Sequence, residues 1–251
     1  MRILFLAKEK NSSCDALEFL IKNNNNVIGV VIPKESEKLK KICIENNIKM
    51  FNEITIYKEI EKIEADLIVS FLFWKKIKKV LIEKFKGRCI NFHPAPLPEY
   101  RGVGGYNFAI LDDLKYWGVS VHYIDENIDT GKIIETVHFP IEKNISAIEL
   151  ENKSQKYLLE LFKKIIINFQ NGIITDGFEQ SEGKYINKQE LEDTKKIDIN
   201  DKIENIDKKI RAFWFPPYTG AYIEIKGKKY TLLNEEMLKK IKELEVKNEQ
   251  K

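Results

Sequence analysis

Short runs of consecutive apolar residues alternate with amphipathic segments along most of the chain. Continuous apolar runs of about four to eight residues are typical of strands buried on both faces, whereas apolar residues at every third or fourth position indicate helices. The apolar runs predict buried strands over residues 3–7, 27–33, 66–73 and 88–92, and a short extended piece over 48–51. The segments between them predict helices over residues 16–22, 35–46, 56–63 and 75–85, the first preceded by turn and N-cap residues at 11–15.

This alternation of strands and helices predicts an α/β protein. Parallel strands joined by helices form a sheet that is covered on both faces, and ligands bind beyond the carboxyl ends of its strands. The pattern continues with helices over residues 106–113 and 146–171 and strands over residues 119–124 and 132–139. We therefore expect a Rossmann-like, mostly parallel sheet.

The character of the chain changes after about residue 183, where segments rich in lysine and aspartate begin. The elements expected there are a helix over residues 203–212 and a hairpin of residues 221–225 and 229–233. The last fifteen or so residues are charged and are expected to be helical or frayed. We predict a catalytic domain over residues 1–183 and a small C-terminal appendage over residues 184–251.

Composition narrows the possible classes of function. The chain has 251 residues, of which 43% are hydrophobic and 32% charged, as in an ordinary soluble globular protein. Its net charge of +3 is small and does not favour a nucleic-acid partner. The three cysteines are far apart and form no zinc-binding pattern, so we expect reduced thiols in a cytoplasmic protein. No apolar stretch has membrane-spanning length, and the N-terminal apolar run is too short for a signal peptide.

A proline-rich segment over residues 91–102 begins at the end of the strand at 88–92. Pro94, Pro96 and Pro98 fix φ and remove backbone donors, which predicts a stiff, irregular ledge. Asn91 and His93 are two residues apart on extended backbone, so their side chains point to the same side. The glycine-rich residues 102–105 match neither the dinucleotide fingerprint nor the phosphate-binding loop.

A second polar segment, residues 125–131, connects the strands at 119–124 and 132–139 and ends in Asp129-Thr130-Gly131. The glycine permits a tight turn that aims Asp129 inward. His122 and His138 alternate within the flanking strands, and for both we expect a structural or partly exposed position.

Two motifs together resemble the signature of folate-dependent formyltransferases. The first is Asn91-x-His93 followed by Pro-Leu-Pro-x-Tyr-Arg-Gly, and the second runs from Gly118-Val-Ser-Val-His122 to Ile128-Asp-Thr-Gly131. The similarity extends over roughly residues 1–180. The family includes methionyl-tRNA, glycinamide-ribonucleotide and amino-sugar formyltransferases, which share an Asn, His and Asp constellation.

The resemblance implies a formyltransferase fold and catalytic roles for Asn91, His93 and Asp129. Asn91 is expected to donate to the tetrahedral oxyanion, His93 to accept the proton of the attacking amine, and Asp129 to orient the imidazole or relay a proton. Which of His93 and Asp129 moves the proton stays open. The implied co-substrate is N10-formyltetrahydrofolate, and the chemistry requires no metal.

The resemblance also implies binding residues. For folate these are Phe71, Leu72, Phe73 and Ile128, although the first three equally suit a plain strand core. For the second substrate, residue type and position make Arg101, Tyr106, Asn107, Trp214 and Tyr218 the candidates. Arg101 suits a phosphate, a substrate carbonyl or a surface carboxylate, and the aromatic loop at 213–220 suits either nucleotide stacking or the core of the appendage.

The sequence of residues 91–98 is similar to that of enzymes that formylate nucleotide-linked amino sugars for surface polysaccharides. The aromatic loop is similar to the C-terminal element of sugar formyltransferases. The transfer-RNA branch more often has small residues after the histidine and a longer C-terminal domain. We therefore expect a dTDP-linked 3- or 4-amino-dideoxy sugar as the acceptor, and a cytoplasmic homodimer without a nucleic-acid or membrane partner. The alternatives are a methionyl-tRNA or ribonucleotide formyltransferase, and a non-catalytic folate or sugar-nucleotide binding protein.

Overall fold

The computed structural model describes residues 1–239 and 241, which form two compact units. The first unit contains Met1–Arg101, Gly118–His138 and Ser154–Lys184. The second contains Gly102–Trp117, Phe139–Lys153 and the described residues from Tyr185 onward. Each unit is thus assembled from separate stretches of chain, and the division into domains at residue 183 stays a prediction.

Seven strands form one sheet within the described residues, in the order β3-β2-β1-β4-β5-β7-β8. They are β1 (Arg2–Ala7), β2 (Asn26–Val31), β3 (Met50–Phe51), β4 (Leu67–Phe71), β5 (Cys89–His93), β7 (Tyr116–Tyr123) and β8 (Ile133–Pro140). The first five pair in parallel, and β7 pairs antiparallel to β5. The expected α/β class with a mostly parallel sheet is confirmed.

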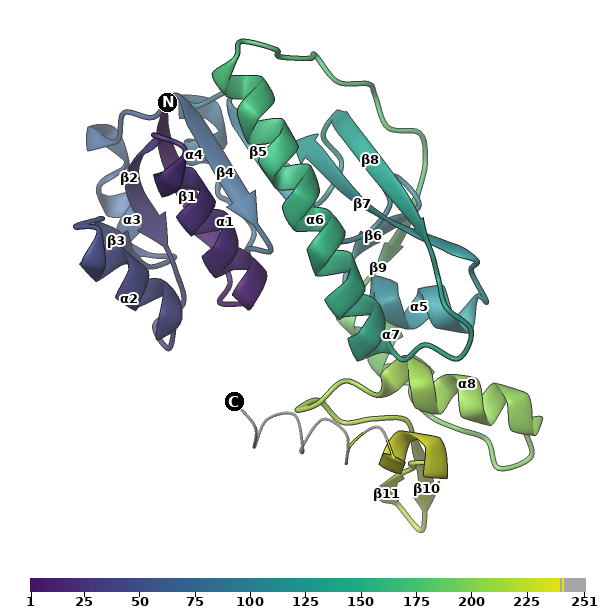
Figure 1. Cartoon of the computed structure of the whole chain (residues 1–251). Coiled ribbons are helices and arrows are strands. Elements are labelled where there is room, and N and C mark those ends of the chain that lie inside the picture. The colour runs from purple at the N-terminus through teal and green to yellow at the C-terminus, as the bar shows by residue number, and fades with distance from the viewer. Residues whose placement is uncertain (240, 242–251) are drawn as a thin grey trace. The chain divides into compact units, whose positions relative to one another are not determined.

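Helices cover both faces of the parallel part of this sheet (Figure 1). They are α1 (Asn11–Lys22), α2 (Lys38–Glu45), α3 (Thr55–Lys58), the 3-10 turn η1 (Ile60–Lys62), α4 (Lys79–Lys84) and α6 (Ala147–Gln170). Alternate residues of each buried strand contact opposite layers. Leu4, Leu6 and Ile68 therefore share one buried cluster with Ile56 of α3 and Leu81 of α4.

The opposite face of the sheet is built around Phe162 of α6. The centre of its ring lies 5.0 Å from that of Phe92, 5.3 Å from that of Phe71 and 6.2 Å from those of Phe5 and Phe19. Phe162 is fully buried, as are Phe5, Phe71 and Phe92 of three neighbouring strands. Tilted and edge-to-face aromatic pairs add to the free energy of burial, so this cluster holds α6 onto the strands that carry the polar site.

We expect Phe162→Ala to lower the free energy of unfolding by about 3–5 kcal/mol, because it removes a buried ring and leaves a cavity among other rings. Urea unfolding followed by circular dichroism measures the change. Phe178→Ala is the matched control, since Phe178 is 56% exposed, and its loss is expected to be below about 1 kcal/mol. Equal losses in the two variants would contradict the central role of Phe162.

Several predicted boundaries are wrong. The first helix begins at Asn11 and not after a turn, and its N-cap Lys10 makes no side-chain capping bond. Ser12, in the segment expected to contain turn and N-cap residues, lies inside the helix, and its Oγ donates to Gln155 Oε1 at 2.8 Å. The helix expected over 75–85 is shortened to Lys79–Lys84, because the backbone at Lys78 is extended and its N–H donates to Tyr57 Oη at 3.0 Å.

The second unit contains the predicted helix α8 (Ile203–Phe213) and the predicted hairpin of β10 (Tyr222–Ile225) and β11 (Lys228–Thr231). It also contains α5 (Gly105–Leu111) and the unpredicted helix α7 (Lys188–Thr194). The two-stranded sheet of β6 (Tyr100–Gly102) and β9 (Lys184–Ile186) was also unpredicted, and its residues Tyr100, Arg101 and Lys184 belong to the first unit. Most of the predicted frayed C-terminal segment lies outside the described residues.

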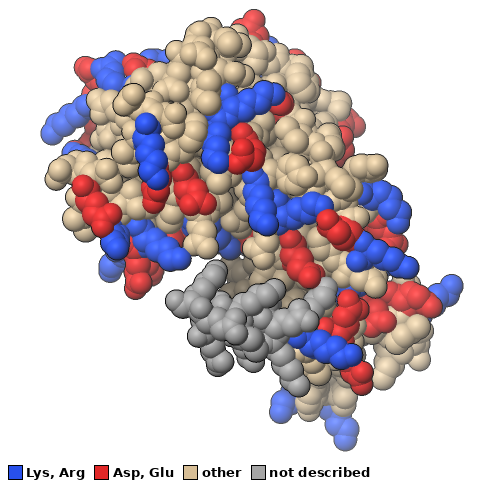
Figure 2. Space-filling model, viewed as in Figure 1, with Lys and Arg blue, Asp and Glu red and all other residues tan. Residues whose placement is uncertain are grey.

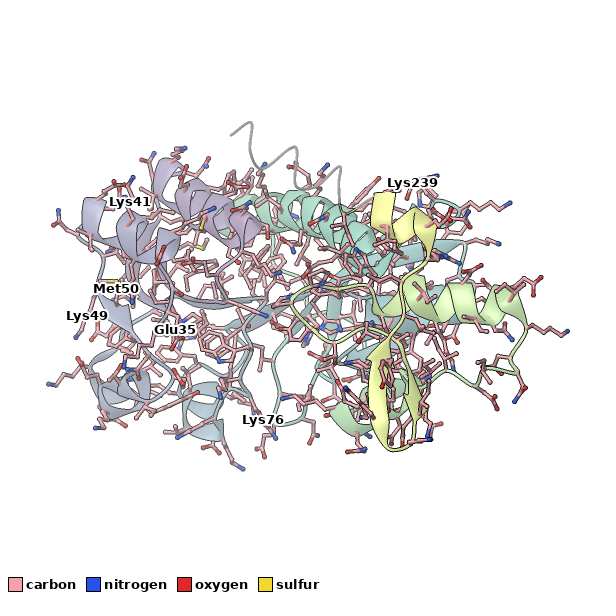
Figure 3. The ribbon with its side chains drawn as sticks, turned by 90° about the horizontal axis from the view of Figure 1, so that it is seen from below. Glu35, Lys41, Lys49, Met50, Lys76 and Lys239 are labelled. Carbon is pink, nitrogen blue, oxygen red and sulfur yellow. The ribbon has the colours of Figure 1, made fainter. Side chains whose placement is uncertain are left out.

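The surface carries mixed charge. On the face drawn in Figure 2, Lys and Arg side chains are interspersed with Asp and Glu side chains among the described residues. The short edge strand β3 begins at Met50 and directly follows Lys49, and Figure 3 labels both residues. A lysine beside a short edge strand discourages pairing with another sheet.

No helix in the described part of the chain is both long and apolar enough to cross a membrane.

The three cysteines are free and buried. Burial raises the pKa of the Cys89 thiol to about 12, and it raises the pKa values of Cys14 and Cys43 to about 11. The folded chain therefore keeps thiol protons that the unfolded chain has lost above about pH 9.

We expect the free energy of unfolding to fall as the pH rises from about 9 to 11, because the unfolded state binds fewer protons there. One such thiol contributes a slope of at most about 1.4 kcal/mol per pH unit. Denaturant unfolding of wild type and Cys89→Ala at pH 8 and pH 10.5 measures this, and the variant should show the smaller pH dependence. An identical pH dependence in the two proteins would contradict the assignment to Cys89.

Candidate active site

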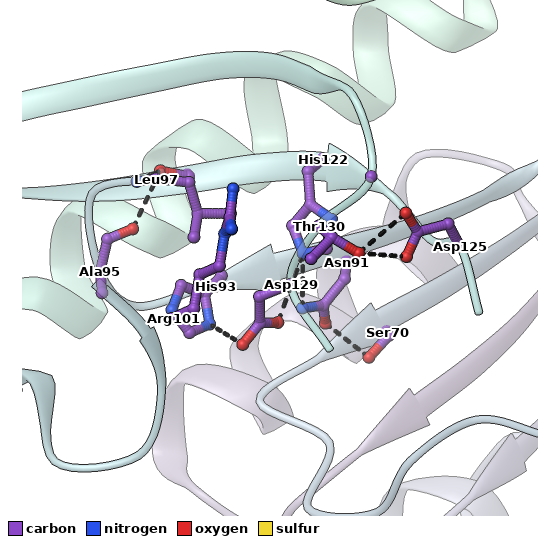
Figure 4. A network of polar contacts seen from close by, with 12 residues as sticks. Ser70, Asn91, His93, Ala95, Leu97, Arg101, His122, Asp125, Asp129 and Thr130 are labelled. Atoms are coloured by element: carbon purple, nitrogen blue, oxygen red, sulfur yellow. Dashed lines mark hydrogen bonds and ion pairs between the residues drawn. The ribbon is translucent and has the colours of Figure 1, made fainter. Parts of the chain in front are cut away.

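The structure brings Asn91, His93 and Asp129 together in the first unit (Figure 4). Asn91 and His93 lie at the carboxyl end of β5, and Asp129 lies in the loop between β7 and β8. The distance from His93 Nδ1 to Asp129 Oδ2 is 3.6 Å. The side chains of His93 and Asp129 are 10% and 11% exposed, so this pair is largely shielded from water. Shielding strengthens the interaction of such groups with one another.

His122 joins the same cluster, although its sequence position indicated only a structural or partly exposed residue. Its Nε2 lies 3.1 Å from Asn91 Nδ2 and 3.6 Å from Asp129 Oδ1. Its Nδ1 lies 2.7 Å from the Tyr123 carbonyl oxygen, which only accepts hydrogen bonds. In the neutral ring the proton is therefore on Nδ1, and Nε2 accepts from the Asn91 amide.

Asn91 is held in one orientation by two partners. Its Oδ1 accepts from Ser70 Oγ at 2.7 Å, and its Nδ2 donates one N–H to His122. Ser70 belongs to β4 and His122 to β7, the two strands that flank β5. The hydrogen bonds from Ser70 to Asn91 and from Asn91 to His122 leave the second N–H of the Asn91 amide as a preorganised donor.

The imidazole of His93 is oriented by backbone. Its Nε2 lies 3.0 Å from the Tyr100 carbonyl oxygen, so this nitrogen carries a proton. In the neutral ring the lone pair is consequently on Nδ1, the nitrogen that faces Asp129. An acceptor nitrogen and a carboxylate that face each other form a site for one proton.

The loop that carries Asp129 has an unusual backbone. Asp129 itself has a φ of +57°, in the left-handed region that non-glycine residues rarely adopt. Gly131 is required two residues later, because a Cβ there would lie 1.9 Å from the Tyr123 carbonyl oxygen. Within the loop, Thr130 Oγ1 donates to the Asp125 carboxylate at 2.7 and 2.8 Å. Such strain persists where surrounding contacts enforce it, and it concentrates at functional sites.

The proline ledge is anchored by one buried serine. Ser120 Oγ lies 2.9 Å from the Ala95 carbonyl oxygen, to which it donates, and it accepts from the Leu97 amide at 2.9 Å. Because β7 pairs with β5, Ser120 stands opposite His93 in the register. The ledge is therefore tied to the same strand pair as the polar cluster.

The predicted folate residues lie at the end of β4 and within the loop that carries Asp129. The Phe71 side chain is fully buried in the aromatic cluster, so only its backbone is available to a ligand. Leu72 has a φ of +55° and is half-buried, and the Phe73 and Trp74 rings lie 4.5 Å apart. Ile128 is 41% exposed beside Asp129. Half-buried apolar groups next to a polar cluster suit a flat aromatic ligand.

Arg101 lies in the first unit but bonds to protein groups. Its Nε and Nη2 donate to Gln180 Oε1 at 3.1 and 2.7 Å, and Nη2 also donates to the Ser181 carbonyl oxygen at 2.9 Å. The surface carboxylate considered as a partner is thus replaced by a carboxamide and a backbone carbonyl. A contact of Arg101 with substrate stays a prediction.

The other predicted substrate residues lie in the second unit. The Tyr106 ring packs 5.9 Å from Trp117, and Asn107 Nδ2 donates to the Ala212 carbonyl oxygen at 2.6 Å, which joins α5 to α8. In the aromatic loop Tyr218 is 61% exposed. The indole N–H of Trp214 is buried and has no hydrogen-bond partner among the described residues.

The sequence analysis did not predict the roles of three residues at this site, namely Ser70, His122 and Gln180. For the first two a signal exists in the strand pairing, because Asn91 is level with Ser70 in β4 and with His122 in β7. Gln180 follows the long helix in an irregular segment, and nothing local marks it. No cluster of three or more His, Cys, Asp or Glu suited to a metal ion occurs among residues 1–239 and 241.

The arrangement can perform acyl-transfer chemistry. Asn91 provides a fixed N–H donor for a developing oxyanion, and the His93–Asp129 pair provides a shielded site for a proton. The half-buried apolar side chains of Leu72 and Phe73 follow the end of β4, the strand that carries Ser70.

Two family descriptions match the chain. "Formyl transferase" matches residues 1–166, and "Formyl transferase, C-terminal domain" matches residues 191–247. Among curated proteins, the methionyl-tRNA formyltransferase of Finegoldia magna is 26% identical over 85% of this chain and 73% of its own length. That of Clostridioides difficile is 28% identical over 68% of this chain and 60% of its own length.

Solved structures are also similar. An N-formyltransferase from Helicobacter canadensis in complex with folinic acid and dTDP-3-aminofucose has a TM-score of 0.75 and 29% identity, covering 94% of this chain and 89% of its own. WlaRD, a sugar 3N-formyl transferase with dTDP and 5-N-formyl-THF, has a TM-score of 0.76 and 31% identity, covering 91% and 84%. A 4-N formyltransferase from Francisella tularensis, 24% identical with a TM-score of 0.78 over 93% and 97%, shares the fold.

Proposed function

The chain belongs to the formyl transferase family, and on this premise we propose that it transfers a formyl group from N10-formyltetrahydrofolate to the amine of a dTDP-linked 3- or 4-amino-dideoxy sugar. One observation carries the proposal. Two similar structures with 29% and 31% identity cover 94% and 91% of this chain. They are of an N-formyltransferase with folinic acid and dTDP-3-aminofucose and of a sugar 3N-formyl transferase with dTDP and 5-N-formyl-THF.

In the proposed reaction a C–N bond forms between the amine and the formyl carbon, and the bond from that carbon to folate N10 breaks. Asn91 donates its second N–H to the oxyanion of the tetrahedral intermediate, while Ser70 and His122 hold the amide in place. The lone pair on His93 Nδ1 accepts the proton that the amine loses. Asp129, 3.6 Å away, stabilises the resulting imidazolium. The proton then passes to the leaving N10.

The proposed folate contacts are the backbone of Phe71 and the side chains of Leu72, Phe73 and Ile128. The left-handed Leu72 turns the chain at the end of β4, and the half-buried Phe73 supplies an apolar wall. Ile128 is exposed beside the catalytic carboxylate, where an apolar ligand would cover it. These features support a flat, apolar-sided co-substrate next to the site.

The proposed acceptor contacts are in the second unit. Tyr218 is exposed and suits stacking on a base, and the unpartnered indole N–H of Trp214 suits a polar group of the ligand. Tyr106 and Asn107 at the start of α5 are proposed to contact the sugar.

The exposed hairpin of β10 and β11 is proposed as the contact of a cytoplasmic homodimer, because an isolated two-stranded hairpin is marginal in water.

A second candidate acceptor is charged initiator tRNA. The curated relatives of F. magna and C. difficile are methionyl-tRNA formyltransferases, and their names favour this acceptor. Interspersed charges on the face in Figure 2 offer no large basic patch there among the described residues. Binding to tRNA depends on phosphate contacts and is strongly weakened by salt.

The test is turnover with N10-formyltetrahydrofolate and a panel of acceptors. The panel contains dTDP-linked 3-amino and 4-amino dideoxy sugars, their UDP counterparts and charged initiator tRNA, and mass spectrometry detects the added formyl group. Product from one dTDP-sugar supports the proposal and identifies the amine. Product from tRNA alone, lost at raised salt, transfers the proposal to the second candidate. A protein that binds the folate but formylates no acceptor contradicts an enzymatic role with these substrates.

A further inference from the structure

Gln180 makes hydrogen bonds in two directions. Its Nε2 donates to the Asp129 carbonyl oxygen at 3.0 Å and to the Gly131 carbonyl oxygen at 2.6 Å. Its Oε1 accepts from Arg101 Nε at 3.1 Å and from Arg101 Nη2 at 2.7 Å. Both halves of the carboxamide are therefore used, and all of these residues belong to the first unit.

Few side chains can replace this carboxamide. Carbonyl oxygens only accept and a guanidinium only donates, so the residue between them must present an acceptor to Arg101 and a donor to the loop. Asparagine is one methylene shorter, glutamate has no donor when ionised, and leucine has neither group. The positive charge of Arg101 also polarises the amide and strengthens the two bonds that its N–H groups donate.

The two carbonyls that Gln180 binds flank Thr130 in the loop that carries Asp129. Asp129 has a left-handed backbone with a φ of +57°, which requires enforcement from outside the residue. Within the loop, the Asp125 carboxylate accepts a hydrogen bond from the Thr130 hydroxyl. From outside the loop, Gln180 donates to the carbonyl oxygens of Asp129 and Gly131. The backbone conformation in turn sets the direction of the Asp129 carboxylate toward His93 Nδ1.

Arg101 connects this loop to the other member of the pair. Tyr100 and Arg101 are consecutive in β6, where the Tyr100 carbonyl accepts from His93 Nε2 and Arg101 holds Gln180. One short strand therefore orients His93 directly and Asp129 through Gln180. The relative geometry of the imidazole and the carboxylate depends on two adjacent residues.

We propose that Gln180, held by Arg101, is a positioning residue that keeps the Asp129 carboxylate aligned with the His93 imidazole during formyl transfer. The role of Gln180 in formyl transfer rests on the proposed function. The hydrogen bonds of Gln180 to Arg101 and to the loop that carries Asp129, which we call the clamp, rest on the structure alone. The clamp also assigns Arg101 a task that differs from substrate binding.

Two variants of Gln180 separate the two directions of bonding. Gln180→Glu keeps an acceptor for Arg101 but removes the donors and sets a negative charge against two carbonyls. Gln180→Leu removes both functions at similar size. Glu179→Gln is the matched control, because the neighbouring Glu179 side chain is 79% exposed and forms an ion pair with Lys132 at 3.1 Å.

In steady-state kinetics both Gln180 variants are expected to lower kcat about 10- to 100-fold, since a displaced catalytic group loses about this much. The KM for N10-formyltetrahydrofolate should change less than about threefold, and the acidic limb of the pH profile of kcat should move. Glu179→Gln should match wild type. A kcat within about twofold of wild type in both Gln180 variants would overturn the inference, as would a fall in Tm with unchanged kcat per folded molecule.

Hydrogen–deuterium exchange tests the clamp without relying on turnover. Amides over residues 125–131 should exchange faster in both Gln180 variants than in wild type or Glu179→Gln. Unchanged exchange overturns the clamp even where wild type is an active formyltransferase. Faster exchange in a protein that formylates nothing on the acceptor panel supports the clamp and overturns the proposed function, so the two failures are distinguishable.

Discussion

His93→Ala is expected to lower kcat by about 10²- to 10⁴-fold, the usual contribution of a positioned general base. The imidazole is fixed by the Tyr100 carbonyl at 3.0 Å and faces Asp129 at 3.6 Å, so the substitution removes the acceptor nitrogen Nδ1 from its place beside this carboxylate. Steady-state formylation of the preferred acceptor at saturating folate measures the effect. Circular dichroism checks that the variant is folded.

His138→Ala is the control for this prediction. His138 is also a histidine of the sheet, but it is exposed on β8 and belongs to no part of the polar cluster. Its kcat should equal that of wild type. If His93→Ala retains a kcat within about threefold of wild type, His93 is not the base and the proposed mechanism fails.

Asn91→Asp is expected to lower kcat and kcat/KM together by about 10²- to 10³-fold. The substitution keeps the shape of the side chain and an acceptor for Ser70 Oγ, but it replaces the N–H donor by a second oxygen. That oxygen repels the oxyanion, which develops only in the transition state. Pre-steady-state and steady-state rates on the same acceptor measure the loss, and folate binding by fluorescence should stay close to wild type.

Asn127→Asp adds the same negative charge at an exposed position of the loop that carries Asp129. Its expected change in kcat is less than about twofold, because a solvated charge is screened. A loss in Asn127→Asp as large as that in Asn91→Asp would attribute the effect to charge near the site and would contradict the donor role of Asn91.

Local pattern was sufficient for much of the fold. Buried strands such as Leu67–Phe71 and Cys89–His93 are apolar runs that need a sheet covered on both faces, and α6 is a long amphipathic segment with clear boundaries. The wrong predictions concern the ends of helices. Lys78 donates its N–H to Tyr57 Oη instead of entering α4, and this partner is distant along the chain.

The candidate site divides in the same way. Asn91 and His93 face the same side of β5 because side chains in a strand alternate with a period of two, which is a property of the local backbone. The motif that runs from Gly118 to Gly131 was recognisable through its resemblance to a family. The contacts of Ser70 and His122 with Asn91 were not predictable, because each forms only through the pairing of β5 with β4 on one side and with β7 on the other.

The sequence by itself determined the alternation of strands and helices, the stiffness of the proline ledge and the common direction of Asn91 and His93, since these depend on neighbours a few residues apart. Only the tertiary structure decided that β7 runs antiparallel beside β5, that Asp129 reaches His93, and that Arg101 and Gln180 hold the loop between them. The physical reason is that strand order, register and side-chain hydrogen bonds join residues far apart in the chain, where many pairings satisfy the same local pattern.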